Sequence, residues 1–501
     1  MAEPSPFEPR GDFIDGRFAL PARVSGEIAL EDPGDTGALT NAFPFSHDAV
    51  EAAVAAAQRA YPAWRDADPA ERAACLQRFA ETLEAERERL AEVIAREIGK
   101  PLWEARTEVT AMIGKVAITL GHGLDLVRER SFDAAGGRVA RWRWHSRGVL
   151  AVLGPFNFPG HLVHGHVVPA LATGNSVVIK PSERAPAIGQ LYAELAARAG
   201  FPPGVLNLVQ GDGEQGARLA AHASVDGVLF TGSYGIGRRI LEATLDQPHK
   251  LIALEMGGKN GVLVCEDADL DAAAAAIAFA TCVTAGQRCS MTSRVIALRG
   301  VAADLVDRLV PIFERIAVGY PLDPGVFMGP VISAAARAHH AAVLDWAREE
   351  GAERLVDGGP CEGPRPGHYV RPSLHRVPAL SPSRYQTEEH FVPDAYLLEV
   401  NSLDEGIAAL DATEYGLSSS VFSADRASFE RAYRETRVGL INWNTTTVGA
   451  SSELPFGGVG KSGNDRAAGI LSTVYSTYPV ASMEVDEPGP PASYPGFPEA
   501  T

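Results

Sequence analysis

The 501-residue sequence has little cysteine, little positive charge and no long hydrophobic run. Its five cysteines are odd in number and scattered from Cys75 to Cys361, which excludes the disulfide framework of a small secreted domain. Cysteine use this sparse is typical of a reducing cytosol, so we expect a cytoplasmic protein. The sequence has no CxxC pair and no cluster of histidine with cysteine, and we therefore expect no metal site.

Lysine and arginine number 45 against 63 aspartates and glutamates, which gives a formal net charge of −18. An acidic surface repels phosphate backbones and anionic lipid, so neither nucleic acid nor a membrane is an expected partner. The longest apolar stretch, residues 272–285, contains two threonines and is too short to span a bilayer, so we expect a buried helix there. The first residues have no basic region followed by an apolar core, unlike a signal peptide.

Apolar residues recur at helical spacing over residues 47–99, which predicts an all-helical entry region. From residue 149 onward, short apolar β-rich runs alternate with helical segments, as in parallel strands that helices cover on both faces. This pattern predicts an α/β protein with doubly wound sheets. The expected strands are 149–153, 176–179, 205–209, 227–230 and 251–254, then 260–264, 294–297 and 440–443 in a second series.

Two further segments predict exposed strands. Residues 138–145 alternate in polarity and carry two tryptophans, and 474–485 are a second run of this kind. An exposed strand of this composition aggregates unless something covers it, and a partner subunit is the simplest cover. We therefore expect a homodimer or homotetramer. The proline-rich tail, 487–501, is expected to be disordered.

Glycine-rich loops follow several expected strands. Residues 211–216 match G-x-G-x-x-G and make Gly213 a candidate phosphate contact, but no acidic residue ends the next strand, so a plain glycine turn is an equal alternative. Residues 230–237 end a strand and open a helix, whose free amides can bind phosphate; Ser233 could equally be only the helix cap. The candidates here are Gly232, Ser233, Tyr234, Gly235, Ile236 and Gly237.

Lys180 and Glu183 follow the strand 176–179, at the edge of the sheet where open α/β proteins bind ligands. Both side chains can form hydrogen bonds with ribose hydroxyls, although an ion pair in a solvated loop is the alternative. A carboxylate near the 2′ position repels a 2′-phosphate, so Glu183 favours NAD over NADP.

Three residues have the chemistry for acyl transfer. Cys289 lies in a glycine-containing turn beside Arg288, and a nearby cation favours the thiolate. Glu255 follows the strand 251–254, where burial would raise the pKa of the carboxyl toward that of a general base. Asn157 lies between two aromatic residues and offers an amide for an oxyanion. Each also has a structural alternative, as a packing cysteine, a loop carboxylate or a turn asparagine.

Together these segments resemble the aldehyde dehydrogenase superfamily from about residue 10 to residue 485. GPFNFP, GNSVVIKPSE, FTGS, LEMGGKN, GQRCS, EEHF and PFGGVGKSG occur in family order. The resemblance implies an NAD-binding domain (10–130 and 149–254), a catalytic domain (255–450) and oligomerisation strands (131–148 and 470–486). It implies Cys289 as the nucleophile, Glu255 as the general base and Asn157 as an oxyanion donor. It also assigns Phe156, Glu389 and Phe391 to the nicotinamide end of the cofactor.

Within the superfamily, several segments are most similar to the branch that oxidises N-succinylglutamate 5-semialdehyde in arginine catabolism by the succinyltransferase route. They are GKPLWEA, NFPGHL and INWN, and His166 stands where many members have lysine. One departure is Val392, where the family usually has glycine, and it leaves the conformation of the Glu389 loop open. Oxidation of another aldehyde is one alternative. A nucleotide-independent cysteine hydrolase and a non-catalytic structural protein are alternatives of other classes.

Overall fold

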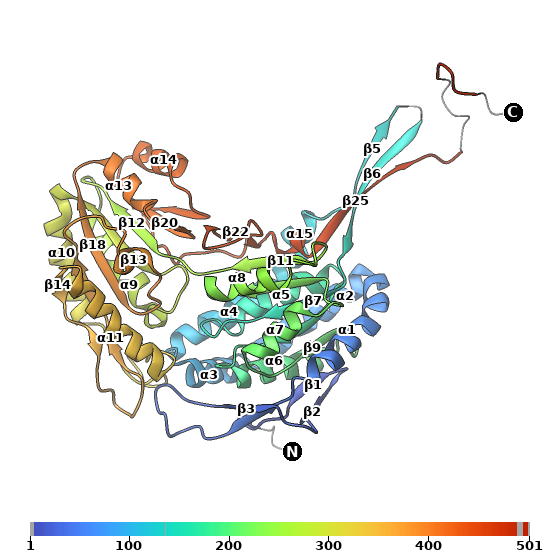
Figure 1. Cartoon of the computed structure of the whole chain (residues 1–501), viewed down its shortest axis with the longest axis horizontal. Coiled ribbons are helices and arrows are strands. Elements are labelled where there is room, and N and C mark those ends of the chain that lie inside the picture. The colour runs from blue at the N-terminus through green and yellow to red at the C-terminus, as the bar shows by residue number, and fades with distance from the viewer. Residues whose placement is uncertain (1–4, 136, 488–493, 499–501) are drawn as a thin grey trace.

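The computed structural model describes residues 5–135, 137–487 and 494–498, and Figure 1 shows two lobes with a narrow arm. Each lobe contains a seven-stranded, mostly parallel sheet that helices cover, which confirms the expected α/β fold with two doubly wound sheets. Within the described residues, no helix is both long and apolar enough to cross a membrane. The expected disordered tail, 487–501, lies largely outside the described residues. The proposed domain boundaries stay predictions.

The first lobe is built around one of the two seven-stranded sheets. In spatial order the strands are β11 (Leu251–Glu255), β10 (Gly227–Thr231), β7 (Val149–Leu153), β8 (Ser176–Lys180), β9 (Leu206–Leu208), β1 (Asp12–Ile14) and β2 (Arg17–Ala19). The first five are parallel and almost wholly buried, as strands covered on both faces must be. The helices are α1 (Ala49–Asp66), α2 (Pro69–Ala85), α3 (Arg87–Ile98), α4 (Leu102–Ile118), α5 (His161–Ala172), α6 (Pro186–Ala199), α7 (Gly213–Ala221) and α8 (Tyr234–Ala243).

The second lobe repeats this architecture with a separate core. In spatial order its strands are β14 (Glu353–Val356), β17 (Ser373–Arg376), β18 (Asp394–Val400), β13 (Thr292–Leu298), β12 (Asn260–Val264), β20 (Ser418–Phe422) and β21 (Leu440–Trp443). Only β14 is antiparallel to its neighbour. The helices are α9 (Leu270–Cys282), α10 (Arg299–Glu314), α11 (Ala334–Glu349), α12 (Arg384–Thr387), α13 (Leu403–Leu410) and α14 (Arg426–Glu435).

Several short strand pairs connect these lobes and close their edges. They are β3 (Gly26–Ala29) with β4 (Ala42–Phe45), β15 (Gly359–Pro360) with β16 (Val370–Arg371), β19 (Tyr415–Gly416) with β23 (Val459–Gly460), and β22 (Pro455–Phe456) with β24 (Ala468–Gly469). The last pair returns the chain to the first lobe. There α15 (Ser472–Tyr475) packs against α5.

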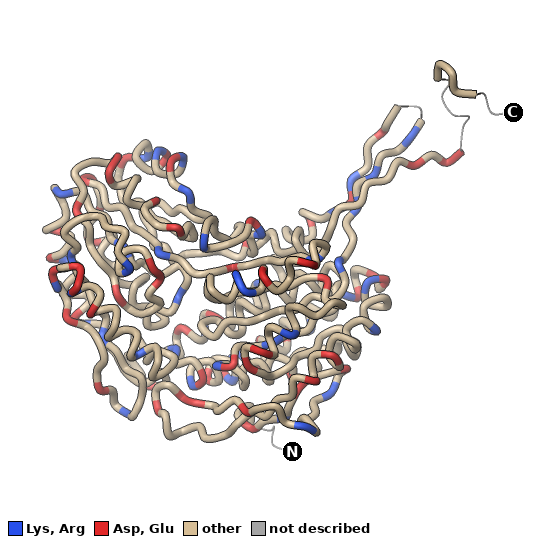
Figure 2. The backbone as a smooth tube through the Cα atoms, viewed as in Figure 1, with Lys and Arg blue, Asp and Glu red and all other residues tan. Residues whose placement is uncertain are grey.

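The arm is a three-stranded antiparallel sheet of β5 (Arg130–Ala134), β6 (Arg138–Ser146) and β25 (Thr477–Glu484) that projects away from both lobes (Figure 1). Its apolar side chains are exposed, among them Trp142 and Tyr478. Figure 2 shows lysine and arginine interspersed with aspartate and glutamate on both lobes and along the arm. The arm thus exposes both charged and apolar side chains.

Most expected strands occur within one or two residues of their predicted ends, but two expectations were wrong in detail. The alanine-rich helix ends at Cys282 rather than at residue 285, because Thr284, Ala285 and Gly286 have positive φ angles that no helix can contain. The run 474–485 is not strand throughout, since α15 reaches Tyr475 and the strand begins at Thr477.

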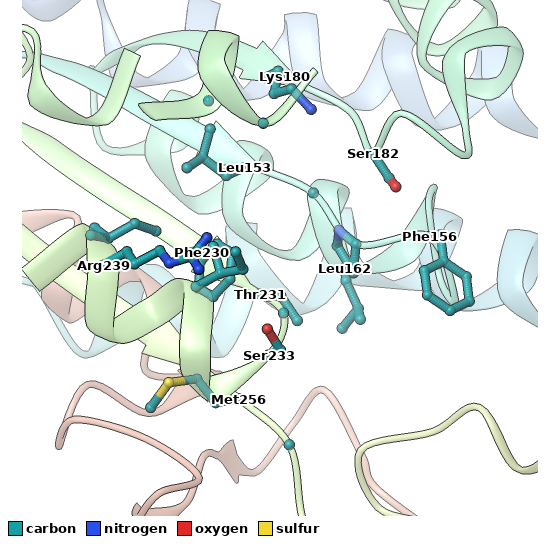
Figure 3. A pocket seen from close by; sticks show the side chains of 18 of the residues that line it. Leu153, Phe156, Leu162, Lys180, Ser182, Phe230, Thr231, Ser233, Arg239 and Met256 are labelled. Atoms are coloured by element: carbon teal, nitrogen blue, oxygen red, sulfur yellow. The ribbon is translucent and has the colours of Figure 1, made fainter. Parts of the chain in front are cut away.

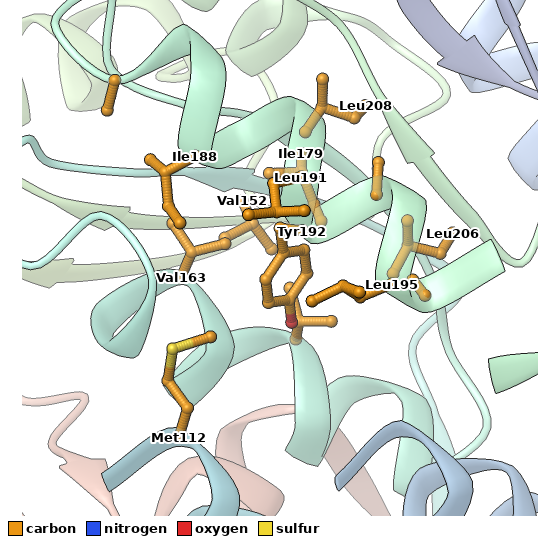
Figure 4. Packing of buried hydrophobic residues seen from close by; sticks show 14 of the residues in the cluster. Met112, Val152, Val163, Ile179, Ile188, Leu191, Tyr192, Leu195, Leu206 and Leu208 are labelled. Atoms are coloured by element: carbon orange, nitrogen blue, oxygen red, sulfur yellow. The ribbon is translucent and has the colours of Figure 1, made fainter. Parts of the chain in front are cut away.

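Helices α4 and α5 pack against each other, and their buried side chains join those of α6 in the core of the first lobe. Figure 4 shows Val163 of α5 and Tyr192 of α6 close to the sheet residues Val152 and Ile179, with Met112 of α4 further out in the same core. Full burial of each such side chain contributes about 1.5–3 kcal/mol. The polar residues that α4 and α5 carry are therefore held on a rigid support.

Candidate active site

A cleft of about 600 Å³ opens at the carboxyl ends of the first sheet's parallel strands. Leu153, which ends β7, and Lys180, which ends β8, both line it (Figure 3). This edge is where open α/β sheets bind ligands. From here the cleft extends to Cys289 and Glu389 beyond the first sheet, so it joins elements of both series of strands.

The predicted ribose contacts lie at one end of this cleft. Lys180 Nζ is 3.6 Å from Glu183 Oε2, so the ion pair given as the alternative is present, while the Glu183 side chain remains half exposed and both residues line the cleft. Burial lowers the pKa of the Lys180 ammonium, and Glu183 opposes that shift. Gly213 also lines the cleft, as predicted. Sequence reasoning missed Ser182 and Arg239 in this part (Figure 3).

The turn between β10 and α8 lies along the middle of the cleft. Gly232, Ser233 and Ile236 line it, whereas Tyr234, Gly235 and Gly237 do not. Gly237 instead allows close packing, because a Cβ there would lie 2.5 Å from the sulfur of Met256. The Ser233 hydroxyl makes no capping hydrogen bond to α8. This helix end therefore keeps its hydroxyl and its amides for an anionic ligand.

Glu389 lies at the far end of the cleft. Its Oε1 accepts a hydrogen bond of 2.9 Å from the Gly258 amide, and a Cβ on Gly257 would collide with the carboxylate at 2.0 Å. The glycine pair thus makes room for this close approach. Burial raises the pKa of Glu389 to about 7, against the lowering effects of the Gly258 amide and Lys259. The Phe391 and Phe156 rings, 5.9 Å apart, lie edge to face beside it.

Val392 adopts ordinary backbone angles in this loop. The residue with a positive φ is Phe391 (56°), so the left-handed position precedes the valine. Val392 is buried in the core of the second lobe, and Glu389 still lines the cleft. A valine is therefore compatible with a loop in which the family usually has glycine.

Cys289 lies where the cleft meets a second cavity of about 290 Å³. Arg288 favours the thiolate, as expected of a nearby cation, but other effects outweigh it. Burial, then Glu389 and Glu255, raise the pKa of the Cys289 thiol to about 12, and Arg288 offsets only part of this rise. The Arg288 guanidinium is itself paired with Glu104 of α4 at 2.8 Å.

Two buried side chains hold the Cys289 turn. Glu104 accepts hydrogen bonds from the amide and hydroxyl of Thr284, and Arg288 donates to the same carboxylate. Asn260 Nδ2 donates to the carbonyls of Cys289 and Met291, both at 2.8 Å. These bonds fasten a turn whose backbone is otherwise strained.

Glu255 lines the second cavity together with Cys289. Its Oε1 accepts a 3.2 Å hydrogen bond from the Ala468 amide, while its buried Oε2 has no partner among the described residues. Burial raises the pKa of Glu255 well above its ordinary value. A buried carboxylate with one unused oxygen beside a thiol is suited to proton transfer.

Asn157 lines the cleft on the side of Cys289, as predicted. Its Nδ2 donates a 2.9 Å hydrogen bond to the carbonyl of Gln287, two residues before the cysteine. An amide nitrogen has two hydrogens, so this bond fixes the side chain and leaves one donor for a reacting oxygen.

The second cavity contains polar residues that sequence reasoning did not identify as a site. Lys115 of α4 and His161 and His166 of α5 line it beside Glu255. Helix α5 is apolar and mostly buried, so the sequence marks no face of it, and only the packing of α4 on α5 shows that these residues face a cavity. Among the described residues, no group of three or more histidines, cysteines or acidic residues could hold a metal ion.

Known proteins share this sequence and this fold. The chain matches the aldehyde dehydrogenase family over residues 22–478. It is 43% identical over 448 residues to "N-succinylglutamate 5-semialdehyde dehydrogenase 1" of Caulobacter vibrioides, which covers 88% of this chain and 92% of that protein. It is 40% identical over 484 residues to "N-succinylglutamate 5-semialdehyde dehydrogenase" of Paraburkholderia xenovorans, with coverages of 96% and 98%.

Among solved structures, PnpE of Pseudomonas sp. WBC-3 in complex with nicotinamide adenine dinucleotide superposes with a TM-score of 0.91. It is 33% identical, and the alignment covers 96% of this chain and 99% of that one. The motifs identified in the sequence, the two-sheet fold and these matches agree. The chain therefore belongs to the aldehyde dehydrogenase family, whose members are oxidoreductases that act on aldehydes.

Proposed function

We propose that this protein oxidises N-succinyl-L-glutamate 5-semialdehyde to N-succinyl-L-glutamate, with NAD as the electron acceptor. The observation that carries the covalent mechanism is the position of Cys289 where two cavities meet. One of them has the features of a dinucleotide site, and the other contains Glu255. The substrate assignment is supported by the names of the relatives from Caulobacter vibrioides and Paraburkholderia xenovorans.

The cleft fits a dinucleotide in size and in the order of its groups. Glu183 and Lys180 suit the adenosine ribose, and the uncapped Ser233 turn suits the pyrophosphate. Glu389 uses one oxygen for the Gly258 amide, which leaves the other for a hydroxyl of the nicotinamide ribose. Phe391 lies at the same end as Cys289. The exposed Glu183 carboxylate favours NAD because it repels a 2′-phosphate.

Cys289 forms the bond to the aldehyde carbon. Because the pKa of its thiol is about 12, the thiol needs a base, and Glu255 lines the same cavity with an unused oxygen that can accept the proton. The second hydrogen of Asn157 Nδ2 and the Cys289 amide then stabilise the oxyanion. NAD, when bound, accepts the hydride from the carbon, and a thioester remains on Cys289.

After hydride transfer, Glu255 releases the proton of the thiol to solvent, and the ionised carboxylate then completes the reaction by activating water. Its raised pKa makes the ionised carboxylate a stronger proton acceptor than an exposed glutamate. The water attacks the Cys289 thioester, the carbon–sulfur bond breaks, and the acid leaves with the thiol restored.

The test is a comparison of kcat/KM for the succinylated semialdehyde and for hexanal, with NADH formation as the readout and an NAD titration alongside. We expect a strong preference for the semialdehyde, because a site with buried charges leaves them unpaired when a neutral substrate binds. A preference for hexanal would remove the substrate assignment. Turnover without NAD binding would instead indicate a cysteine hydrolase.

We also propose a homodimer or homotetramer, in which the arm is covered by a second subunit. The exposed Trp142, Tyr478 and Met483 on its strands support this assignment. Light scattering of the purified protein tests it, and a monomer at micromolar concentration would contradict it.

A further inference from the structure

The aldehyde-side cavity, defined by Glu255, Cys289, Lys115 and His161, contains a lysine that the reaction does not use. Lys115 is only 2% exposed, and its Nζ donates one hydrogen bond, of 2.7 Å, to the Gly469 carbonyl. An ammonium has three donors, so two are left over. Within the described part of the chain, no carboxylate forms an ion pair with Lys115, and burial without such a partner lowers its pKa to about 8.

The other cations of this wall are already paired. Lys100 is 2.6 Å from Glu108, and Arg288 is 2.8 Å from Glu104. Glu108 also lines the cavity, but its second oxygen accepts the amides of residues 160 and 161. With Glu255, three carboxylates stand against three cations, but Lys115 is the cation of this wall that forms no ion pair among the described residues. A buried unpaired charge is costly, and an anionic ligand would remove that cost.

His161 supplies a second unused polar atom beside this lysine. Its Nδ1 is buried and has no partner among the described residues. Burial, and then the charges of Lys115 and Lys100, lower the pKa of His161 to about 4, so the imidazole is neutral at pH 7. A neutral ring can donate from Nδ1 without adding charge.

We propose that Lys115 and His161 form a subsite that binds a carboxylate of the substrate and so determines the preference for anionic semialdehydes. The subsite rests on the proposed function for its ligand. The cation, the unused imidazole nitrogen and the reacting Cys289 line one cavity, so a single extended molecule can reach all three. Charge-assisted hydrogen bonds to a buried lysine are strong and directional, which suits discrimination between aldehydes.

The test compares Lys115→Met and His161→Leu with wild type. The readout is the ratio of kcat/KM for N-succinylglutamate semialdehyde to kcat/KM for hexanal. We expect this ratio to fall about 100-fold in Lys115→Met and about 10-fold in His161→Leu, mainly through KM. Lys115→Arg keeps the charge and should retain more of the ratio than Lys115→Met.

Lys250→Met is the matched control. Lys250 is also buried and also donates to backbone carbonyls, at 2.9 Å, but it lines neither cavity. Its substitution should leave the ratio as in wild type. An equal loss for both aldehydes in Lys115→Met, or no loss, would overturn the subsite and leave Lys115 with a structural role.

Two truncated substrates identify which carboxylate binds. N-succinyl-4-aminobutanal lacks the α-carboxylate, and N-acetylglutamate semialdehyde lacks the succinyl carboxylate. Lys115→Met should change kcat/KM little for the substrate that lacks the bound carboxylate. It should lower kcat/KM about 100-fold for the substrate that keeps this carboxylate. If the wild-type enzyme prefers hexanal to the succinylated semialdehyde, the proposed function fails by itself. In that case Lys115→Met must still lower the ratio of kcat/KM for succinate semialdehyde to kcat/KM for butanal. An unchanged ratio would refute the subsite as well.

Discussion

Glu104→Gln tests whether one buried carboxylate of α4 holds the Cys289 turn in its active form. Glu104 binds the Thr284 amide at 3.1 Å, the Thr284 hydroxyl, and Arg288 at 2.8 Å. Thr284 and Ala285 have φ angles of 57° and 51°, a conformation that costs about 1–3 kcal/mol per non-glycine residue. The turn therefore persists only while its contacts hold it.

Glutamine fits the same space but leaves Arg288, whose side chain is 14% exposed, without its ion pair. Loss of one partner from a buried pair costs about 3–5 kcal/mol. Lys100 keeps its ion pair with Glu108 at 2.6 Å, so only Arg288 loses its partner. We therefore expect a cost at the lower end of this range, about 3 kcal/mol. Movement of the turn relieves part of this free-energy cost. A displacement of Cys289 by about 1 Å lowers the rate on the order of 100-fold. We therefore expect kcat to fall about 100-fold.

The assay measures three quantities: kcat, the Kd for NAD and the rate of alkylation of Cys289 by iodoacetamide. NAD affinity should change little, because Lys180, Glu183 and Ser233 lie on other elements. Glu88→Gln is the control. It removes an exposed ion pair with Arg106, and the loss of this pair should change stability and all three measured quantities little. Wild-type kcat and alkylation rate in Glu104→Gln would refute the reasoning.

The remaining predictions concern the residues that line the two cavities. Cys289→Ala should abolish aldehyde oxidation while NAD still binds by titration; near-normal turnover would contradict covalent catalysis. Glu255→Gln should give a slowed burst of NADH followed by still slower deacylation in stopped-flow traces, and an unchanged steady state would make Glu255 structural. Glu183→Gln should narrow the NAD over NADP preference in kcat/KM by about tenfold, whereas a wild-type preference for NADP would refute its role. The pKa of Glu389 is raised to about 7, so its carboxylate forms as pH rises through 7. NAD should therefore bind more tightly at pH 8 than at pH 6, and Glu389→Gln should lose that difference.

Much of the fold could be predicted because buried parallel strands read as short apolar runs between glycine-rich turns. The runs that became β7, β8 and β10 are of this kind. The end of α9 could not be predicted from periodicity, since Val283, Thr284 and Ala285 continue past Cys282 without a glycine or proline to mark the end. There the contacts with Glu104, far away in the sequence, decide the backbone conformation.

The candidate site also has some features that the sequence predicts and others that only the structure shows. Residues in motifs, such as Cys289, Glu255 and Glu389, could be named from the sequence because strand ends and glycine turns mark them. The raised pKa of the thiol could not, since burial is its largest cause and is visible only in the folded structure. Lys115 was missed for a related reason: nothing in the sequence of its helix marks it, and its lack of an ion pair is visible only in three dimensions.

The chain from β24 to β25 serves two structures at once. Ala468 and Gly469 hold Glu255 and Lys115 through backbone bonds, and eight residues later Thr477 starts the outer strand of the arm. A deletion that removes the outer strand of the arm would therefore cut next to the segment that holds Glu255 and Lys115. Point substitutions of exposed arm residues such as Trp142 and Tyr478 leave that segment intact and so test the proposed subunit contact without disturbing the cavity.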